Sequence, residues 1–259
     1  MSVEFTLTDG VATILLNRPD KLNAITDAMW DSLAQHLDRC AADEAVHAVV
    51  LTGAGRGFSA GADISGEGRK VRKGGLAGAL DAMGDYNAVV GRLYHLEKPV
   101  VAALRGPVVG IALTMALCCD WILVSDTAKL RPVFLNLAKV PEAGIIYLMR
   151  GMIGELKTRD ILYRASPLSG EEAVEIGLAN RVVADAALMD EANALAAELA
   201  AGPPTAFALT KRLFHLPPTG FDQFVDAEKN AIALAANLDD AREGMAAFRE
   251  KRAPKYTGS

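Results

Sequence analysis

Two glycine-rich segments hold the residues of this chain whose types and spacing can do chemistry. The first covers residues 53–64 and the second covers residues 105–111. Each follows an apolar, β-branched run, residues 48–52 and residues 100–104, so each is expected to leave the end of a strand. Glycines just after a strand let the backbone approach a ligand closely and turn its N–H groups toward it. Two such loops can direct two N–H donors at one oxygen atom, which is the arrangement that an anionic intermediate needs.

Five segments, in their order and spacing, resemble the signatures of the enoyl-CoA hydratase/isomerase (crotonase) superfamily. They are residues 17–24, 58–64, 98–120, 172–179 and 247–252, and the resemblance extends over nearly the whole chain. It implies an α/β fold with a crotonase-like core of stacked ββα turns and a C-terminal helical module used for trimerisation. It also implies an acyl-CoA substrate, so that coenzyme A enters as part of the thioester and no cofactor is bound permanently.

The resemblance places the oxyanion hole of the family at the backbone N–H groups of Ala62 and Ile111. Most members have glycine where Ile111 stands, but isoleucine keeps the N–H donor. Gly110 and Ile111 also lie where a helix is expected to begin, and the helix dipole there favours negative charge on a thioester oxygen. The alternative is that the glycines of both loops only permit tight turns.

The two glutamates that hydratases of this family use are absent, because the matching positions are Thr114 and Phe134. Adding water to a double bond requires a positioned water and a proton delivered to carbon, and paired carboxylates share that work. The sequence therefore disfavours ordinary hydration. Phe134 is expected to line the acyl pocket or to fill the core. Thr114 can bond within the pocket or, more readily, back to its own helix.

One carboxyl group remains in the right region of the sequence. Glu142 falls where several isomerases of the family place the aspartate or glutamate that acts as their base, and its neighbours are mostly apolar. We therefore predict a double-bond isomerisation of an enoyl-CoA with Glu142 as the only general base. The alternative is an exposed glutamate near the start of a helix over residues 144–150.

The resemblance further assigns the coenzyme A contacts to three segments, with the last often reaching the coenzyme from a neighbouring subunit. The assigned residues are Lys21, Leu22 and Ala24, then Ala60, Asp63 and Ile64, and finally Phe248 and Lys251. A lysine ammonium suits a phosphate group, although solvated lysines are the alternative. Residues 65–78 hold five glycines and four basic residues, Arg69, Lys70, Arg72 and Lys73, and form either a solvated loop or a further phosphate contact.

Apolar patterning predicts the elements that must position these residues. Residues 5–7 and 11–16 predict a hairpin, and a helix is expected to start at Thr26. Expected strands at 47–52, 100–104 and 121–125 alternate with expected helices at 81–95, 110–119 and 144–150, which favours a parallel sheet. Segments 187–201, 203–214, 221–236 and 239–251 all read as helical. We therefore expect an α/β acyl-CoA-binding core over residues 1–185 and a helical module over residues 186–259.

Composition excludes several classes of partner. The formal net charge of −5 disfavours nucleic acid, and the longest apolar stretch, residues 107–119, is too short to span a bilayer. The three cysteines have no metal-ligand spacing, and no secretory signal is visible. We expect a cytoplasmic protein without a metal or membrane site, whose partners are acyl-CoA and further copies of itself in a homotrimer or homohexamer.

Three other functions compete with the isomerase. A dinucleotide-dependent oxidoreductase is disfavoured because residues 53–57 lack the spaced glycine fingerprint and no helix opens there. An enoyl-CoA hydratase with non-standard catalytic residues and a non-catalytic acyl-CoA-binding member of the family both stay open. Turnover of enoyl-CoA substrates, compared with coenzyme A binding alone, distinguishes these functions. The sequence leaves the acyl chain length and the position of the double bond open.

Overall fold

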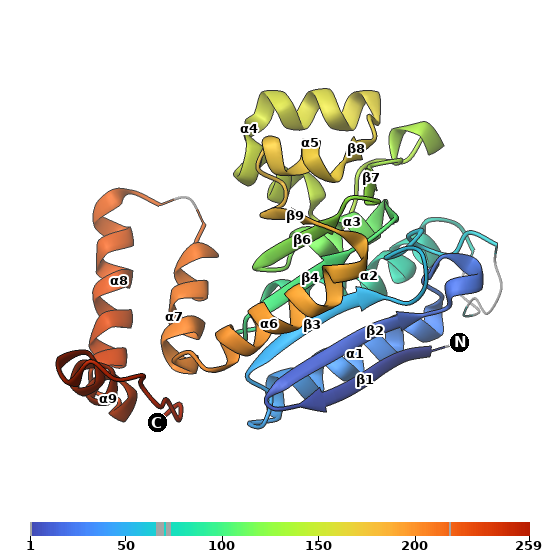
Figure 1. Cartoon of the computed structure of the whole chain (residues 1–259). Helices are drawn as coiled ribbons and strands as arrows, with labels where there is room; N and C mark the ends of the chain where they lie inside the picture. The colour runs from blue at the N-terminus through green and yellow to red at the C-terminus, as the bar shows by residue number, and fades with distance from the viewer. Residues whose placement is uncertain (1, 66–69, 71–73, 218) are drawn as a thin grey trace.

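A six-stranded sheet forms the centre of the fold (Figure 1). The computed structural model describes residues 2–65, 70, 74–217 and 219–259. Neighbouring strands are antiparallel only between β1 and β2, and every other pair in this sheet is parallel, as the alternation of elements predicts. In spatial order the strands are β1 (Ser2–Thr8), β2 (Val11–Asn17), β3 (Ala48–Gly53), β4 (Val100–Leu104), β6 (Trp121–Ser125) and β9 (Arg181–Val183).

Both faces of this sheet are covered by helices, because its central strands are apolar on both sides. Val49 and Leu51 of β3 join the large core with α1 (Asp27–Ala42) and α2 (Gly75–Tyr94), whereas Ala48 and Val50 face α6 (Leu188–Ala200). Figure 1 shows α6 in front of the sheet and α1 behind it. Continuous burial of β3 and β4 is typical of a parallel sheet between two helical layers.

A smaller sheet lies beside the first, near the top of Figure 1. It contains β5 (Pro107–Val109), β7 (Lys129–Arg131) and β8 (Leu168–Ser169). It adjoins α3 (Ile111–Leu117) and α5 (Gly170–Glu175), and α4 (Ile145–Arg164) packs on α3. Three short 3₁₀ turns lie elsewhere along the described chain: η1 (Pro19–Lys21) after β2, η2 (Leu135–Leu137) before α4, and η3 (Asp185–Ala187) before α6. The second glycine loop therefore links the two sheets, since it contains β5.

Two helices extend beyond their predicted bounds. The expected helix at 81–95 is α2, which begins at Gly75 inside the segment predicted as a glycine-rich loop. Leu76 and Leu80 in its first turns are exposed. These turns therefore lack the buried apolar stripe whose periodicity predicts a helix. The expected helix at 144–150 is α4, which continues to Arg164 across a non-helical Gly154.

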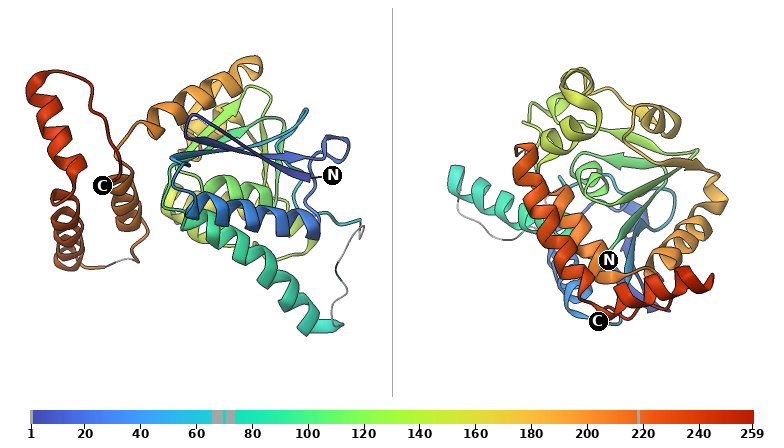
Figure 2. Two further views of the ribbon diagram at one scale, coloured as in Figure 1. Left: turned by 90° about the horizontal axis from the view of Figure 1, so that it is seen from below. Right: turned by 90° about the vertical axis from the view of Figure 1, so that its left-hand side faces the viewer.

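The last three helices, α7 (Pro204–Phe214), α8 (Phe221–Ala236) and α9 (Asp239–Glu250), confirm the helical C-terminal third. In Figures 1 and 2, α8 and α9 stand away from the sheets. The predicted boundary near residue 185 divides the chain by type of element. Packing instead groups α6 with the α/β core, because its Leu188, Ala192 and Ala196 bury against the sheet.

A partly buried ion pair fastens α7 to the core. Lys211, the one residue of α7 that is buried, donates from Nζ to Asp120 Oδ2 at 2.7 Å. The same carboxylate oxygen accepts from the N–H of Val100 at 2.8 Å, at the start of β4. Asp120 therefore connects the sheet with the first helix of the C-terminal part.

Replacing Lys211 with methionine is expected to lower the free energy of unfolding by about 1–3 kcal/mol, because Asp120 keeps its burial and loses its charged partner. Denaturant unfolding measures this change. The control is Arg242→Met, which removes an exposed ion pair with Asp239 and should change stability by less than about 1 kcal/mol. Equal effects of the two variants would contradict a fastening role for Lys211.

Candidate functional site

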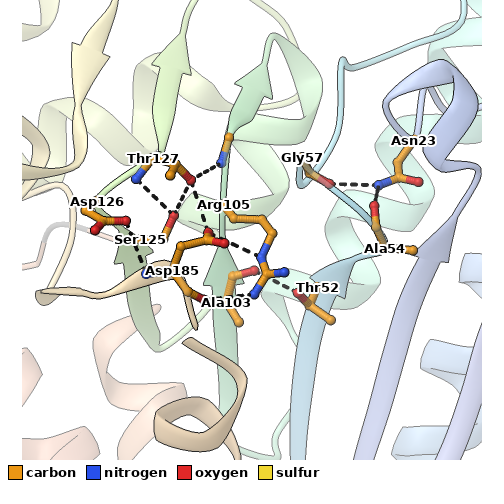
Figure 3. Close-up of polar contacts among 11 residues, drawn as sticks. Asn23, Thr52, Ala54, Gly57, Ala103, Arg105, Ser125, Asp126, Thr127 and Asp185 are labelled. Carbon is orange, nitrogen blue, oxygen red and sulfur yellow. Dashed lines mark hydrogen bonds and ion pairs between the residues drawn. The ribbon is translucent and has the colours of Figure 1, made fainter. Parts of the chain in front are cut away.

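The first glycine loop follows β3 and is held in place by the buried side chain of Asn23. The Nδ2 atom of Asn23 donates to the carbonyls of Ala54 at 2.9 Å and Gly57 at 2.8 Å (Figure 3), and also contacts that of Phe58 at 3.2 Å. In return, Ser59 Oγ donates to the carbonyl of Asn23 at 2.7 Å. One amide side chain thus supplies the hydrogen bonds that an irregular buried loop cannot make within itself.

An ion pair fixes the far end of the same loop. The guanidinium of Arg18, whose side chain is fully buried, binds the carboxylate of Asp63, and the N–H of Ser65 donates to the other carboxylate oxygen at 2.8 Å. Hydrogen bonding by Ser65 and then by Arg18 lowers the pKa of Asp63 to about 2. The carboxylate of Asp63 is therefore engaged within the chain, which leaves its backbone as the part that can meet a coenzyme.

The second glycine loop is hydrogen-bonded directly to the first. Ser59 donates its N–H to the carbonyl of Pro107 and accepts from the N–H of Val109, each at 3.0 Å. Gly61 has φ +86°, and a Cβ atom there would lie 2.6 Å from the carbonyl oxygen of Val109 and 4.0 Å from the nitrogen of Ile111. Only glycine permits this approach, so the spacing of the glycines serves a close contact between the loops.

The N–H groups of Ala62 and Ile111 belong to these adjacent segments. Ile25 donates to the carbonyl of Gly61 at 2.8 Å and accepts from the N–H of Asp63 at 2.9 Å, so the N–H of Ala62 between them points away from Ile25. Ile111 is the first residue of α3, where an N–H has no acceptor in its own helix. Within the described residues neither N–H has a backbone acceptor. The geometry can accommodate the predicted oxyanion hole.

Helix α3 also begins as the sequence analysis expects, at a glycine. Gly110 has φ +57°, in the region that favours glycine, and the side chains nearest to a Cβ there would be Val133 at 3.8 Å and Phe134 at 4.0 Å. Phe134 is buried in the core beside this loop. Thr114 is also fully buried, but its Oγ1 has no hydrogen-bond partner among the described residues, so the expected bond back to its own helix is not made.

Glu142 lies three residues before the start of α4 and is held by a residue that no sequence motif marks. Tyr86 of α2 donates its phenol to Glu142 Oε2 at 2.6 Å. Burial, together with the hydrogen bond to the carboxylate, raises the pKa of Tyr86 and keeps it a donor. Tyr86 and Glu142 are 56 residues apart in the sequence, and no local pattern connects them.

The positions assigned to coenzyme A fall into two groups. Lys21, Leu22, Ala24, Ala60 and Ile64 come from two segments that are joined by the hydrogen bond from the N–H of Ala60 to the carbonyl of Leu22, 2.8 Å long. Phe248 and Lys251 lie at the end of α9, at the left of Figure 1. Lys21, Leu22 and Ala24 of the first group follow β2, whose last residue pairs with Ser2 near the N-terminus, at the right of Figure 1 and away from α9. One chain alone therefore does not bring the two groups together.

Part of the basic segment at 65–78 is already paired. Lys70 donates from Nζ to Asp31 at 2.8 Å and to Asp85 at 3.3 Å, so its charge is shared with two carboxylates. Arg69, Arg72 and Lys73, the other candidates for a phosphate contact, lie outside the described residues. The phosphate contact of this segment stays a prediction.

Other kinds of site have little support in the described part of the chain. It contains no group of three or more His, Cys, Asp or Glu side chains that could hold a metal. No described helix is long and apolar enough to cross a membrane. The three cysteines are free and buried, and burial raises the thiol pKa of Cys40 to about 11 and of Cys118 to about 12, which opposes a nucleophilic role.

Comparison with known proteins agrees with the fold. The sequence profile of the family "Enoyl-CoA hydratase/isomerase" matches residues 6–259. A protein of Escherichia coli K12 named 1,2-epoxyphenylacetyl-CoA isomerase is 36% identical over 252 residues, which cover 96% of this chain and 95% of that protein. A protein of Thermus thermophilus that carries an enoyl-CoA hydratase name is 35% identical over 247 residues, 95% of this chain and 97% of its own length.

Solved structures extend the likeness to three dimensions. The enoyl-CoA hydratase of Bacillus anthracis has a TM-score of 0.93 at 28% identity, with 99% of both chains covered. The enoyl-CoA hydratase subunit I of Geobacillus kaustophilus has a TM-score of 0.90 at 32% identity, covering 100% of this chain and 99% of that one. The chain belongs to the enoyl-CoA hydratase/isomerase family and has the crotonase fold.

Asp63 should make the stability of the protein depend on pH on the acid side. Its pKa is lowered from 3.8 to about 2 in the folded protein, so its contribution is complete above about pH 4 and is lost as the pH falls toward 2. We expect Asp63→Asn to be less stable than the wild type at neutral pH, with the difference shrinking through this window. Denaturant unfolding at a series of pH values measures it.

The control for this pH series is the exposed residue Asp20, on the neighbouring turn. Asp20→Asn should keep the acid slope of the wild type. A slope unchanged by Asp63→Asn would show that the ion pair with Arg18 does not stabilise the folded loop.

Proposed function

We propose that this protein moves a double bond along an enoyl-CoA thioester, with Glu142 as the single general base. The observation that carries the proposal is the placement of one carboxylate, held by Tyr86, while the positions of the hydratase glutamates are occupied by Thr114 and Phe134. A single base suffices for isomerisation, because the same group returns the proton that it removes. Coenzyme A would enter only as part of the substrate.

The oxyanion hole would make the proton acidic enough to remove. The thioester oxygen would accept hydrogen bonds from the N–H groups of Ala62 and Ile111, and Glu142 would take a proton from the carbon next to the carbonyl. The negative charge then develops on the thioester oxygen, at the start of α3, where the helix dipole favours it. One donor of this kind is worth about 3–4 kcal/mol of transition-state stabilisation.

Tyr86 would position the base. Its phenol occupies Oε2 of Glu142, which restricts rotation of the carboxylate and leaves Oε1 for the proton. The negative charge of the enolate is shared with the carbon at the far end of the neighbouring double bond. Glu142 would return the proton to that carbon of the acyl chain.

The names of the relatives include both isomerases and hydratases. The Escherichia coli relative is named an isomerase of a coenzyme A thioester, which favours isomerisation here. The relative from Thermus thermophilus and the Bacillus anthracis structure carry hydratase names, so hydration with non-standard catalytic residues is the second candidate. A chain that hydrates crotonyl-CoA rapidly and isomerises none of a panel of enoyl-CoA thioesters would favour the second candidate.

Replacing Glu142 with glutamine is expected to lower kcat for isomerisation by about 10²–10⁴-fold, since general base catalysis contributes about that much. The affinity for the thioester should stay nearly the same, because glutamine keeps the size of the side chain and the oxyanion hole is untouched. Steady-state kinetics and calorimetry measure the two quantities.

A second variant, Tyr86→Phe, tests the positioning of the base, because it removes only the hydrogen bond to the carboxylate of Glu142. It should lower kcat by less than Glu142→Gln does and leave KM within about threefold, since Glu142 itself remains. Wild-type turnover in Glu142→Gln would refute the mechanism.

We further propose that the protein assembles as a homotrimer or a dimer of trimers. The C-terminal helices leave large apolar side chains in solvent, among them Phe214, Phe221, Ile232, Leu234 and Phe248. Exposed apolar surface of this kind marks interaction sites. Assembly could also bring Phe248 and Lys251 of one subunit to the coenzyme site of the next, which a single chain does not do.

Light scattering is expected to give three or six times the chain mass of 27.4 kDa at micromolar concentration. Phe248, which is 84% exposed in one chain, should tolerate leucine, whereas Phe248→Asp should shift the mass downward by placing a charge in an apolar contact. A monomeric wild type would rule the assembly out.

A further inference from the structure

The hydroxyl of Thr114 is buried without a partner, which is unusual in a folded protein. The side chain is 0% exposed, and its Oγ1 contacts no hydrogen-bonding group among the described residues. The ordinary acceptor for a threonine in a helix is the carbonyl four residues earlier, here that of Gly110. That carbonyl instead accepts from the N–H groups of Leu113 at 3.0 Å and Thr114 at 3.3 Å.

Thr158 shows the ordinary arrangement in the same molecule. It is also buried, at 3% exposure, but its Oγ1 donates to the carbonyl of Gly154, four residues earlier, at 2.8 Å. The unpaired hydroxyl of Thr114 is therefore a property of its site and not of buried threonines in this fold. A polar group kept in such a place points to a partner that the chain itself does not supply.

Along α3, Thr114 lies between Ile111 of the proposed oxyanion hole and Cys118, which borders a cavity. Ile111, Thr114 and Cys118 succeed one another at spacings of three and four residues, so they lie on one side of the helix. Cys118 lines a cavity of about 300 Å³ together with Asn87, Ala143 and Gly144. The chain neighbours of Asn87 and Ala143 are Tyr86 and Glu142, so this cavity adjoins the residues of the proposed base.

An acyl chain whose carbonyl oxygen meets the N–H of Ile111 and whose tail enters this cavity must pass Thr114. The rise between residues 111 and 114 is about 4.5 Å along the helix, which corresponds to the first few carbons of an acyl chain. The neighbours of the loop here, Val133 and Phe134, are apolar and offer the hydroxyl no partner.

We propose that Thr114 determines substrate specificity by hydrogen bonding to an oxygen atom on the acyl group, close to the thioester. The inference rests on the proposed function, because it needs an acyl-CoA thioester in the oxyanion hole. A hydroxyl both donates and accepts, so it can pair with an oxo, hydroxyl or epoxide oxygen. An acyl group without that oxygen leaves the buried hydroxyl unpaired and binds more weakly for that reason.

Calorimetry on the full-length protein with two matched thioesters tests the inference. The probes are 3-oxobutanoyl-CoA and butanoyl-CoA, which differ only in the oxygen on the acyl chain. The wild type should bind 3-oxobutanoyl-CoA about tenfold more tightly. Thr114→Val, which keeps the shape of the side chain and removes the hydroxyl, should reduce this preference to within about twofold by weakening the oxygenated ligand. Thr114→Ser should retain most of it.

Thr158→Val is the matched control. It should keep the preference for 3-oxobutanoyl-CoA but lower the melting temperature, because its hydroxyl is paired within the helix. Thr114→Val should not lower the melting temperature, since no protein hydrogen bond is lost.

Two results would overturn the inference in different ways. A wild type that binds the two thioesters equally well, or a preference that Thr114→Val leaves intact, would overturn it and leave the proposed function standing. A wild type that binds neither thioester would overturn the proposed function as well.

Discussion

The buried side chain of Asn23 is the contact on which the geometry of the site depends. It binds three carbonyl groups of the first glycine loop, while its Oδ1 accepts from the N–H of Arg18 at 2.8 Å. The residue has φ 54°, a left-handed conformation that costs most residues on the order of 1 kcal/mol but suits asparagine. The backbone of a buried loop needs such partners, because it has no helix or strand to pair with.

This fixed loop explains why two backbone N–H groups can remain available. The carbonyl of Gly61 and the N–H of Asp63 are used by Ile25, and Gly61 lies against Val109, so the peptide unit of Ala62 cannot rotate freely. Donors held in position before the substrate arrives need no reorganisation during the reaction. In the described part of the chain, the N–H groups of Ala62 and Ile111 have no backbone acceptor and the hydroxyl of Thr114 has no hydrogen-bond partner, so a ligand could pair with all three.

The C-terminal helices are held differently, since two ion pairs, Lys211 with Asp120 and Arg212 with Glu97, join α7 to the core and α8 buries none of its residues. Large apolar side chains of these helices, such as Phe221 and Phe248, are exposed in the single chain. The helices of the core are thus stabilised by close packing around the parallel sheet. The C-terminal helices make few contacts with the rest of the chain.

The local features of the fold could be predicted from the order of residues alone. Glycines after apolar runs predicted both loops, β-branched runs predicted β3, β4 and β6, and Thr26 predicted the start of α1, because turns, strands and caps depend on neighbouring residues. The missing carboxylates at residues 114 and 134 were also legible in the sequence. Which distant groups meet could not be predicted and follows from the folded structure. Tyr86 reaches Glu142 across 56 residues, Arg18 binds the carboxylate of Asp63 across 45 residues, and α6 packs on the sheet rather than on the other C-terminal helices. These contacts depend on how distant segments pack, and no local pattern of residue types encodes them.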